Sequence, residues 1–304
     1  MRSAPAPEDA ALSADGPSGQ WTVGQALRWV TQRLQDSADN HLPEAGPWLV
    51  AWAGGFDRSI LPLHIDQELS PEQQSALQQA VQRRLSGEPL QYITGQTSFR
   101  RLDLSVRPGV LIPRPETELL VELVLSARPH RVLEIGCGSG AICLSLLQEL
   151  PDVIVVATDI SAAAIQLTAE NARSLQLEAT GRLSLYQDDL ASQLLDQPEQ
   201  HQSFDVLVSN PPYIPSARLA ELAREVRDFE PRPALDGGAD GLVVFRQLLQ
   251  QALWLLRPAG LLAVELYETQ LELAEQEAEA AGFHATKISP DLAGRPRFLT
   301  AQRP

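Results

Sequence analysis

Four consecutive residues, Asn210-Pro211-Pro212-Tyr213, combine groups that suit chemistry on a planar nitrogen. The lone pair of an amide or aromatic amine nitrogen is delocalised, so the nitrogen reacts only if acceptors bind its two hydrogens as the new bond forms. The side-chain oxygen of Asn210 and the carbonyl of Pro211 are two such acceptors, since two prolines donate no N–H groups and hold the chain extended. Tyr213 can stack on the planar group and exclude water. The tetrapeptide therefore predicts a catalytic loop that acts by orientation and electrostatic stabilisation.

A second candidate site is a glycine-rich run between a strand-like and a helical segment. The run is Gly136-Cys137-Gly138-Ser139-Gly140. Its glycines let the backbone approach a ligand closely, and the following helix offers free N–H groups at its start. The pattern predicts a site for a nucleoside cofactor, although a tight turn without a ligand would use the same glycines. Cys137 is expected to be a packing or loop residue, as is Cys143.

Acidic residues near this run narrow the choice of cofactor. Asp159 ends the next predicted strand, where it can accept hydrogen bonds from both ribose hydroxyls, and Asp188 with Asp189 ends the third, within reach of an adenine amino group. Glu134 lies just before the glycines, where it would repel a pyrophosphate but not the cationic methionine part of S-adenosylmethionine (SAM). The spacing Gly-x-Gly-x-Gly also differs from the dinucleotide fingerprint, whose third glycine comes one residue later. The pattern favours SAM over a nicotinamide dinucleotide.

Strands and helices that could carry these loops alternate after Arg131. Continuous apolar strands such as residues 153–157 are typical of a parallel sheet covered on both faces. The predicted fold class is α/β, with a doubly wound, Rossmann-type SAM methyltransferase domain. Strands are expected at residues 132–135, 153–158, 183–187, 206–209 and 261–266, a closing pair at 283–288 and 297–301, and helices at 116–127, 141–150, 162–175, 242–256 and 270–281.

The residues before this domain follow other patterns. Apolar residues recur at helical spacing from Ala26 to Leu34, and Ser70-Pro71-Glu72-Gln73 has the capping residues of a helix start. A β-hairpin is predicted from Tyr92-Ile93-Thr94 and from the alternation of Leu102, Leu104 and Val106. We divide the chain into a disordered tail, a small helical domain, a β-hairpin linker and the methyltransferase domain, at residues 1–20, 21–88, 89–114 and 115–304.

Composition limits the classes of partner. The 24 basic and 39 acidic residues give a net charge of −15, which argues against a nucleic-acid substrate because such binding depends on Lys and Arg at phosphates. Two cysteines fit a reducing compartment, and no apolar run approaches the ~20 residues that span a bilayer. We expect a cytoplasmic, monomeric protein that binds no metal, no membrane and no nucleic acid directly.

Further stretches of the sequence resemble one family, the peptide chain release factor glutamine methyltransferases (HemK/PrmC). Asn-Pro-Pro-Tyr alone is shared with methyltransferases of adenine and guanine amino groups, so these stretches distinguish among them. The resemblance covers residues 20–302, and Leu-Ile-Pro-Arg-Pro-Glu-Thr-Glu is its most specific motif. The matching stretches are residues 87–95, 111–118, 229–235 and 291–294 with Arg297.

This resemblance implies a reaction and a role for each site. The reaction is SAM-dependent methylation of the glutamine side-chain nitrogen in the Gly-Gly-Gln loop of class I release factors, with the helical domain recognising the substrate. Residues 136–140 would hold the methionine part of SAM, Asp159 the ribose, and Asp188 with Asp189 the adenine. Residues 210–213 would hold the glutamine amide, with Asn210 also at the cofactor. Phe99, from the hairpin, would flank both cofactor and substrate.

Two features leave alternatives open. The family usually has a glycine shortly after Glu265, whereas this chain has Leu266-Tyr267, which changes the expected shape of that loop. Arg114 and Glu116 fit equally a linker ion pair with a helix cap, or direct contact with the substrate.

Other functions share some of these features. A methyltransferase of RNA or DNA amino groups has the same catalytic loop, but a basic arm would be expected there. A nicotinamide-dependent oxidoreductase would have the other glycine spacing, and a non-catalytic SAM-binding protein would not need the intact Asn210 loop.

Overall fold

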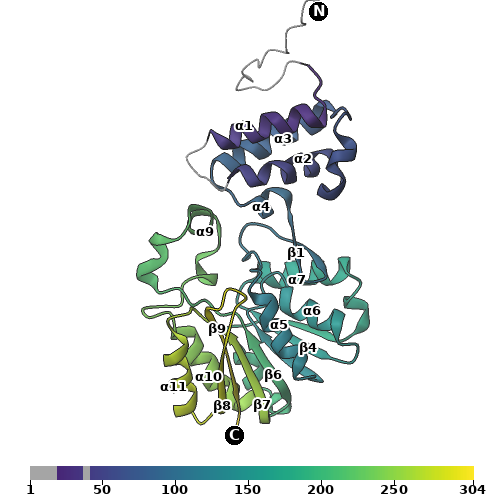
Figure 1. Cartoon of the computed structure of the whole chain (residues 1–304). Coiled ribbons are helices and arrows are strands. Elements are labelled where there is room, and N and C mark those ends of the chain that lie inside the picture. Colours follow the sequence, from purple (N-terminus) through teal and green to yellow (C-terminus); the bar gives the residue numbers. More distant parts are fainter. Residues whose placement is uncertain (1–18, 37–41) are drawn as a thin grey trace, which may run out of the picture. The chain divides into compact units, whose positions relative to one another are not determined.

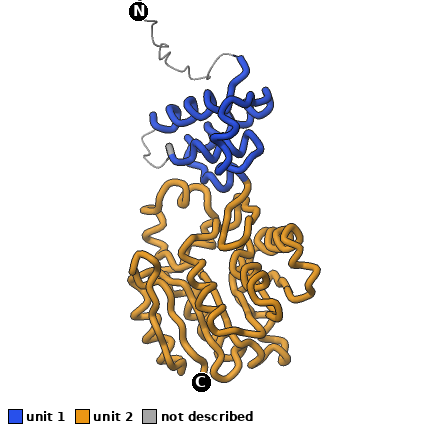
Figure 2. Tube along the Cα trace, turned by 45° about the vertical axis from the view of Figure 1, so that its right-hand side comes forward, with its two compact units in different colours: residues 1–94 blue, residues 95–304 orange. Residues whose placement is uncertain are grey.

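The computed structural model describes residues 19–36 and 42–304, in two compact units that comprise residues 1–94 and 95–304 (Figure 2). Each unit has its own apolar core. The predicted disordered tail at residues 1–20 lies almost wholly outside the described residues. No helix in the described part of the chain is long and apolar enough to cross a membrane.

The described residues of the first unit form helices joined by short connections (Figure 1). The predicted helix start at Ser70 is confirmed: the Ser70 hydroxyl accepts from the Gln73 N–H (3.2 Å), and the Gln73 side chain accepts from the Ser70 N–H (2.8 Å). Trp21, Trp29 and Leu77 are among its fully buried side chains. Its elements are α1 (Val23–Gln35), η1 (Leu42–Ala45), α2 (Gly46–Gly54), η2 (Arg58–His64), α3 (Pro71–Leu85) and α4 (Leu90–Thr94).

The prediction that Tyr92-Ile93-Thr94 belongs to the hairpin is wrong, because these residues form the end of α4. The cause is Pro89, whose carbonyl accepts from the N–H groups of Tyr92 (3.1 Å) and Ile93 (3.2 Å) and so closes a helical turn. Gly95, at φ +76°, then ends the turn. The hairpin itself is β1 (Gln96–Phe99) paired with β2 (Leu102–Ser105), in which the predicted burial of Leu102 and Leu104 is confirmed.

The second unit is built on a seven-stranded sheet in the order β5-β4-β3-β6-β7-β9-β8. The strands from β5 to β7 run parallel, and β9 and β8 close the edge antiparallel, as predicted. β7 begins at Leu256, before the predicted 261, because Leu256 already pairs with Phe204 ahead of a register shift. The strands are β3 (Arg131–Ile135), β4 (Ile154–Asp159), β5 (Leu183–Gln187), β6 (Phe204–Ser209), β7 (Leu256–Glu265), β8 (His284–Pro290) and β9 (Pro296–Gln302).

Helices cover both faces of this sheet (Figure 1). Successive residues of β3 point to opposite faces, so Val132 joins the cluster under α5 and α6, while Leu133 joins the cluster under α10 and α11. This confirms the doubly wound α/β prediction. The helices are α5 (Thr117–Ser126), α6 (Ala141–Glu149), α7 (Ala162–Ser174), α8 (Ser192–Leu195), α9 (Arg224–Phe229), α10 (Val243–Leu255) and α11 (Leu271–Ala280), with η3 (Glu178–Thr180), η4 (Pro198–Gln200), η5 (Ser216–Glu221) and η6 (Arg232–Ala234).

Arg100, at the tip of the hairpin, fastens β1 and β2 to two of these helices. Its guanidinium binds both carboxylate oxygens of Glu149 at the end of α6 (2.6 and 2.9 Å) and one oxygen of Glu122 in α5 (2.6 Å). It also donates to the carbonyl of Glu118 (3.0 Å). Only about a tenth of the Arg100 side chain is exposed, so these charge-assisted bonds are partly shielded from water.

We expect Arg100→Ala to destabilise the second unit, because Glu149 would lose a bidentate partner in a half-buried place. Hydrogen bonds to charged groups contribute about 1.5–3 kcal/mol, so the melting temperature should fall by roughly 3–12 °C for a unit of this size. Arg101→Ala, at the exposed neighbouring position in the same turn, is the matched control. Equal melting temperatures for the two variants in thermal denaturation would contradict this assignment.

Candidate active site

Three parallel strands, β3, β4 and β6, end together at one edge of the sheet. Ile135 of β3 lies opposite both Thr158 of β4 and Ser209 of β6 in the ladder. The residues that follow these strands therefore emerge side by side, and they include the glycine run, Asp159 and Asn210. Ligands bind at this edge in doubly wound sheets.

The glycine run turns sharply from β3 into α6. Gly140 adopts φ +86°, and a Cβ there would lie 2.8 Å from Leu144 and 2.9 Å from Thr168, so glycine is required. The N–H groups of Gly136 and Cys137 both donate to the carbonyl of Thr158 (2.8 and 3.0 Å). These bonds hold the loop against β4.

Asp159 fixes the same loop from its other side. One carboxylate oxygen accepts from the Gly138 N–H (2.9 Å) and the other from the Ser161 N–H (2.8 Å). Burial raises the pKa of Asp159. A carboxylate has about four lone-pair sites, so each oxygen can still accept a further hydrogen bond from a ligand hydroxyl.

The two acids after β5 are placed differently. Asp188 is buried beside Asp159, since its N–H donates to the Asp159 carbonyl (3.0 Å), and its carboxylate accepts from the Gln193 N–H (2.8 Å). Asp189 is exposed.

Asn171 of α7, which sequence reasoning missed, links the hairpin to the glycine run. Its side-chain nitrogen donates to the carbonyls of Ser139 (2.9 Å) and Ser105 (3.0 Å), and its oxygen accepts from the Ser105 N–H (2.9 Å). The side chain is 2% exposed. An asparagine within a helical pattern gives no signal of such long-range bonds.

Glu134 is the penultimate residue of β3, two positions before the glycine run. It is buried, and its carboxylate accepts from the N–H of Cys143 in the first turn of α6 (2.9 Å). Burial raises the pKa of Glu134 to about 8, and the nearby negative charge of Asp159 adds to that shift. Cys137 and Cys143 are buried, and burial raises their pKa values as well, as expected of packing residues.

The Asn210 amide is oriented by a relay of hydrogen bonds. Its side-chain nitrogen donates to the Thr117 hydroxyl (3.1 Å), which in turn donates to the carboxylate of Glu265 (2.7 Å). Within the described residues, neither the Asn210 side-chain oxygen nor the Pro211 carbonyl accepts a hydrogen bond. Both acceptors that the sequence singled out are thus available to a ligand.

Tyr213 is held by the same carboxylate. Its hydroxyl donates to the second oxygen of Glu265 (3.3 Å). Burial and the negative charge of Glu265 raise the pKa of the phenol, so Tyr213 stays neutral. Glu265 therefore positions both ends of the tetrapeptide.

A cavity of about 370 Å³ opens in front of Asn210, Pro211 and Tyr213. Arg114, on its wall, binds Glu230 through two bonds of 2.7 Å, and the Arg218 guanidinium lies 5.3 Å from the centre of the Tyr267 ring. The remaining lining residues are Leu111, Ile214, Pro215, Glu221, Leu222, Val226, Ala234, Leu235 and Arg297.

Arg297 is a lining residue of particular interest. Its Nε is buried without a hydrogen-bond partner among the described residues, and its nearest acid is Asp291 at 3.9 Å.

Glu116 is the N-cap residue of α5 but makes no capping bond. The linker ion pair predicted as one possibility for Arg114 is present, with Glu230 as its partner.

Phe99 is not among the residues that line this cavity. Its ring is 1% exposed and packs in the apolar cluster that includes Leu102 and Leu104. The prediction that it flanks cofactor and substrate gains no support from this position. Leu111, three residues before Arg114, contributes the apolar wall instead, and its place in the Leu-Ile-Pro-Arg-Pro motif could have suggested it.

No group of three or more His, Cys, Asp or Glu side chains among the described residues is arranged to hold a metal ion.

Two family models match the chain in sequence. They are the PrmC N-terminal domain, over residues 25–95, and the methyltransferase small domain, over residues 115–225. The release factor glutamine methyltransferase of Moorella thermoacetica is 42% identical over 287 residues, which cover 93% of this chain and 99% of that protein. The MTRF1L release factor glutamine methyltransferase of Homo sapiens is 37% identical over 276 residues, covering 86% of this chain and 81% of that one.

A solved structure also resembles the chain. The catalytic domain of hMettl16 in complex with MAT2A 3'UTR hairpin 6 matches with a TM-score of 0.54 and 15% identity, covering 76% of this chain and 81% of that chain. At this identity the likeness concerns the fold alone.

Glu134 should make stability depend on pH. Its pKa is raised in the folded chain, from a model-peptide value of 4.5 to about 8, so its proton is bound more tightly in the folded state. Its stabilisation is then complete below about pH 4.5 and is lost as the pH rises through 8. Between these limits stability should fall with a slope of up to ~1.4 kcal/mol per pH unit.

Glu134→Gln keeps an acceptor for the Cys143 N–H and does not titrate. In thermal melts from pH 5 to 8.5, we expect the variant to lose less stability than the parent. Parallel curves for the two proteins would rule out the shifted pKa.

Proposed function

The chain belongs to the release factor glutamine methyltransferases, and from this we propose that it transfers the methyl group of SAM to the glutamine side-chain nitrogen in the Gly-Gly-Gln loop of class I release factors. The observation that carries the proposal is the pair of acceptors, Asn210 Oδ1 and the Pro211 carbonyl, which face a cavity with no hydrogen bond of their own within the described residues. A primary amide has two N–H donors to match them.

The residues around the glycine run fit SAM. Residues 136–140 would hold its methionine part, and a cation bound there would favour the ionised form of Glu134. Asp159 retains lone pairs that would serve the ribose hydroxyls, and Asp188 would accept from the adenine amino group. The exposed Asp189 would contribute less than its neighbour. When bound, SAM supplies a methyl group activated by a sulfonium sulfur.

The chain's own residues prepare the amide nitrogen for that methyl group. Asn210 Oδ1 and the Pro211 carbonyl bind its two hydrogens, which fixes the direction of the nitrogen lone pair and raises its electron density. The Tyr213 ring lies where it can cover the planar amide and exclude water. The nitrogen would gain the methyl group as the bond between that methyl group and the sulfonium sulfur breaks, and it would then lose one proton to bulk water. Until that proton leaves, the two oxygens would stabilise the positive charge on the nitrogen.

A nucleic-acid substrate is not favoured by the cavity. Three arginines line it, but each faces an acid: Arg114 binds Glu230, Arg218 binds Glu221 at 3.2 Å, and Arg297 lies 3.9 Å from Asp291. Little positive charge is left for phosphates, which dominate the affinity of nucleic-acid-binding proteins.

The helical unit would recognise the body of the release factor. Four large apolar side chains in and around η2 are exposed, and we name them the η2 patch; as a group they would offer apolar area to a protein partner. Arg58 lies over the Trp48 ring at 4.4 Å, which orders part of the patch. Its members are Trp48, Ile60, Leu63 and Ile65, with exposed fractions of 48%, 39%, 83% and 37%.

Asn210→Ala tests the acceptor role. It removes one of two acceptors whose hydrogen bonds to the amide strengthen toward the transition state. We therefore expect turnover to fall on the order of 10²–10³-fold. The affinity for SAM, measured by calorimetry, should change little. Mass spectrometry of a release factor incubated with SAM and each protein gives the rate, and near-parental turnover in the variant would exclude the role.

Leu63→Gln tests the η2 patch. If Leu63 contacts the release factor, KM for the intact factor should rise about five-fold, or about 1 kcal/mol, with kcat and SAM affinity unchanged. Leu273→Gln, at an exposed leucine of α11 in the other unit, is the matched control. The same KM for Leu63→Gln and the parent would remove Leu63 from the contact surface.

A further inference from the structure

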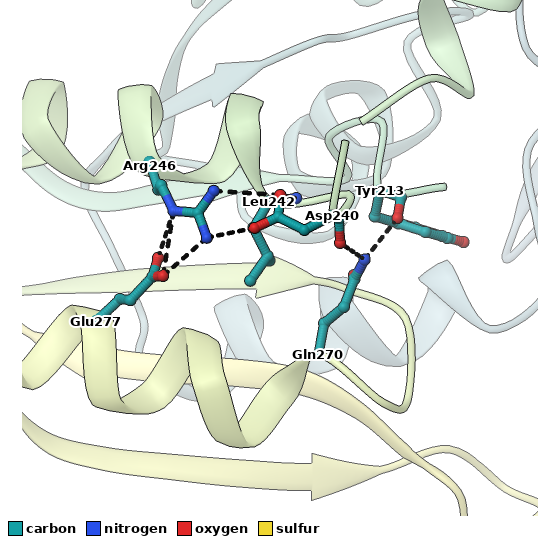
Figure 3. Close-up of polar contacts among 6 residues, drawn as sticks. All are labelled: Tyr213, Asp240, Leu242, Arg246, Gln270 and Glu277. Carbon is teal, nitrogen blue, oxygen red and sulfur yellow. Dashed lines mark hydrogen bonds and ion pairs between the residues drawn. The ribbon is translucent and has the colours of Figure 1, made fainter. Parts of the chain in front are cut away.

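The tetrapeptide cannot hold its own backbone in place, because Pro211 and Pro212 have no N–H groups. Its last carbonyl, that of Tyr213, accepts a hydrogen bond from outside the loop. The donor is the side-chain nitrogen of Gln270, at 2.8 Å (Figure 3). Gln270 is the N-cap residue of α11 and is 6% exposed.

The Gln270 amide is fully used. Its second N–H donates to the carbonyl of Asp240 (2.9 Å), and its oxygen accepts from the Tyr267 N–H (3.2 Å). One side chain thus joins the end of β7, the loop before α10 and the catalytic loop. Both N–H groups point at carbonyls, so no acceptor-only side chain can replace it.

The loop of residues 237–241 packs closely against the Gln270 side chain and the catalytic tetrapeptide. A Cβ on Gly237 would lie 2.7 Å from the Pro212 carbonyl, and one on Gly241 would meet both the Tyr213 carbonyl and the Gln270 nitrogen. The backbone of this loop is therefore packed directly against the catalytic tetrapeptide.

A second anchor holds the loop from its outer side. Arg246 binds both carboxylate oxygens of Asp240 (3.1 and 2.6 Å) and is itself bound by Glu277 of α11 (2.8 Å) (Figure 3). Arg246 thus acts on the side chain of Asp240, whereas Gln270 acts on its carbonyl and on Tyr213. The two anchors share the loop, but only Gln270 bonds to the tetrapeptide.

We propose that Gln270 is a positioning residue for methyl transfer: by holding the Tyr213 carbonyl, it sets the angle at which Asn210 and Pro211 present their acceptors. The inference rests on the proposed function, because it concerns the same loop. Without this bond the tetrapeptide keeps its residues but loses the geometry on which transition-state binding depends. A displacement of ~1 Å at such a site can cost about 10²-fold in rate.

Gln270→Glu is the sharpest test, because it preserves size and the acceptor for Tyr267 while placing an oxygen against two carbonyls. We expect kcat for methylation of an intact release factor to fall about 10–100-fold, with KM and the calorimetric Kd for SAM changed less than two- to three-fold. Arg246→Met loosens the same loop without touching Tyr213, and it should retain kcat within about three-fold.

Gln270→Met removes the donors without adding a charge, and it replaces Gln270→Glu if the latter melts more than about 10 °C below the parent. A parental kcat in the folded Gln270 variant, or an equal loss of kcat in Arg246→Met, would overturn the inference. A parent protein that binds SAM but methylates no release factor would overturn the proposed function, and the inference with it. Methylation of a release factor by the parent protein therefore separates a failure of the proposed function from a failure of the role of Gln270.

Discussion

The hydroxyl of Thr117 has one proton, and the destination of that proton sets the direction of the Asn210 amide. Because the proton goes to Glu265, the Thr117 oxygen can only accept, and it must face the nitrogen of Asn210 rather than its oxygen. The amide oxygen is thereby turned away, toward the cavity. A buried carboxylate with two neutral donors, Thr117 and Tyr213, thus determines the polarity of the whole site.

This relay explains why several distant elements must meet. Thr117 begins α5, Asn210 follows β6, and Glu265 ends β7, and these residues lie up to 148 positions apart in the chain. The parallel register of β6 and β7 brings the last two together, and the Arg-Pro-Glu-Thr linker carries the first. The linker motif is in this sense part of the active site, although its arginine pairs with Glu230 instead of lying free.

The sequence predicted the parts of the molecule that rest on local chemistry. Apolar runs predicted the covered strands, and the glycines predicted the turn from β3 to α6. Bonds between distant side chains were not predictable, since nothing near Asn171 or Gln270 marks them as partners of Ser139 or Tyr213. Tyr92 has a side chain that favours strands, but Pro89 closes a helical turn at this position and places Tyr92 in α4.

Two acids next to the glycine run, Glu134 and Asp159, have a consequence for the binding of a charged ligand. Burial raises the pKa of both, and a cation held beside them would lower these pKa values again. Binding of a cation at this edge of the sheet would therefore be linked to the release of protons, so its affinity would rise with pH.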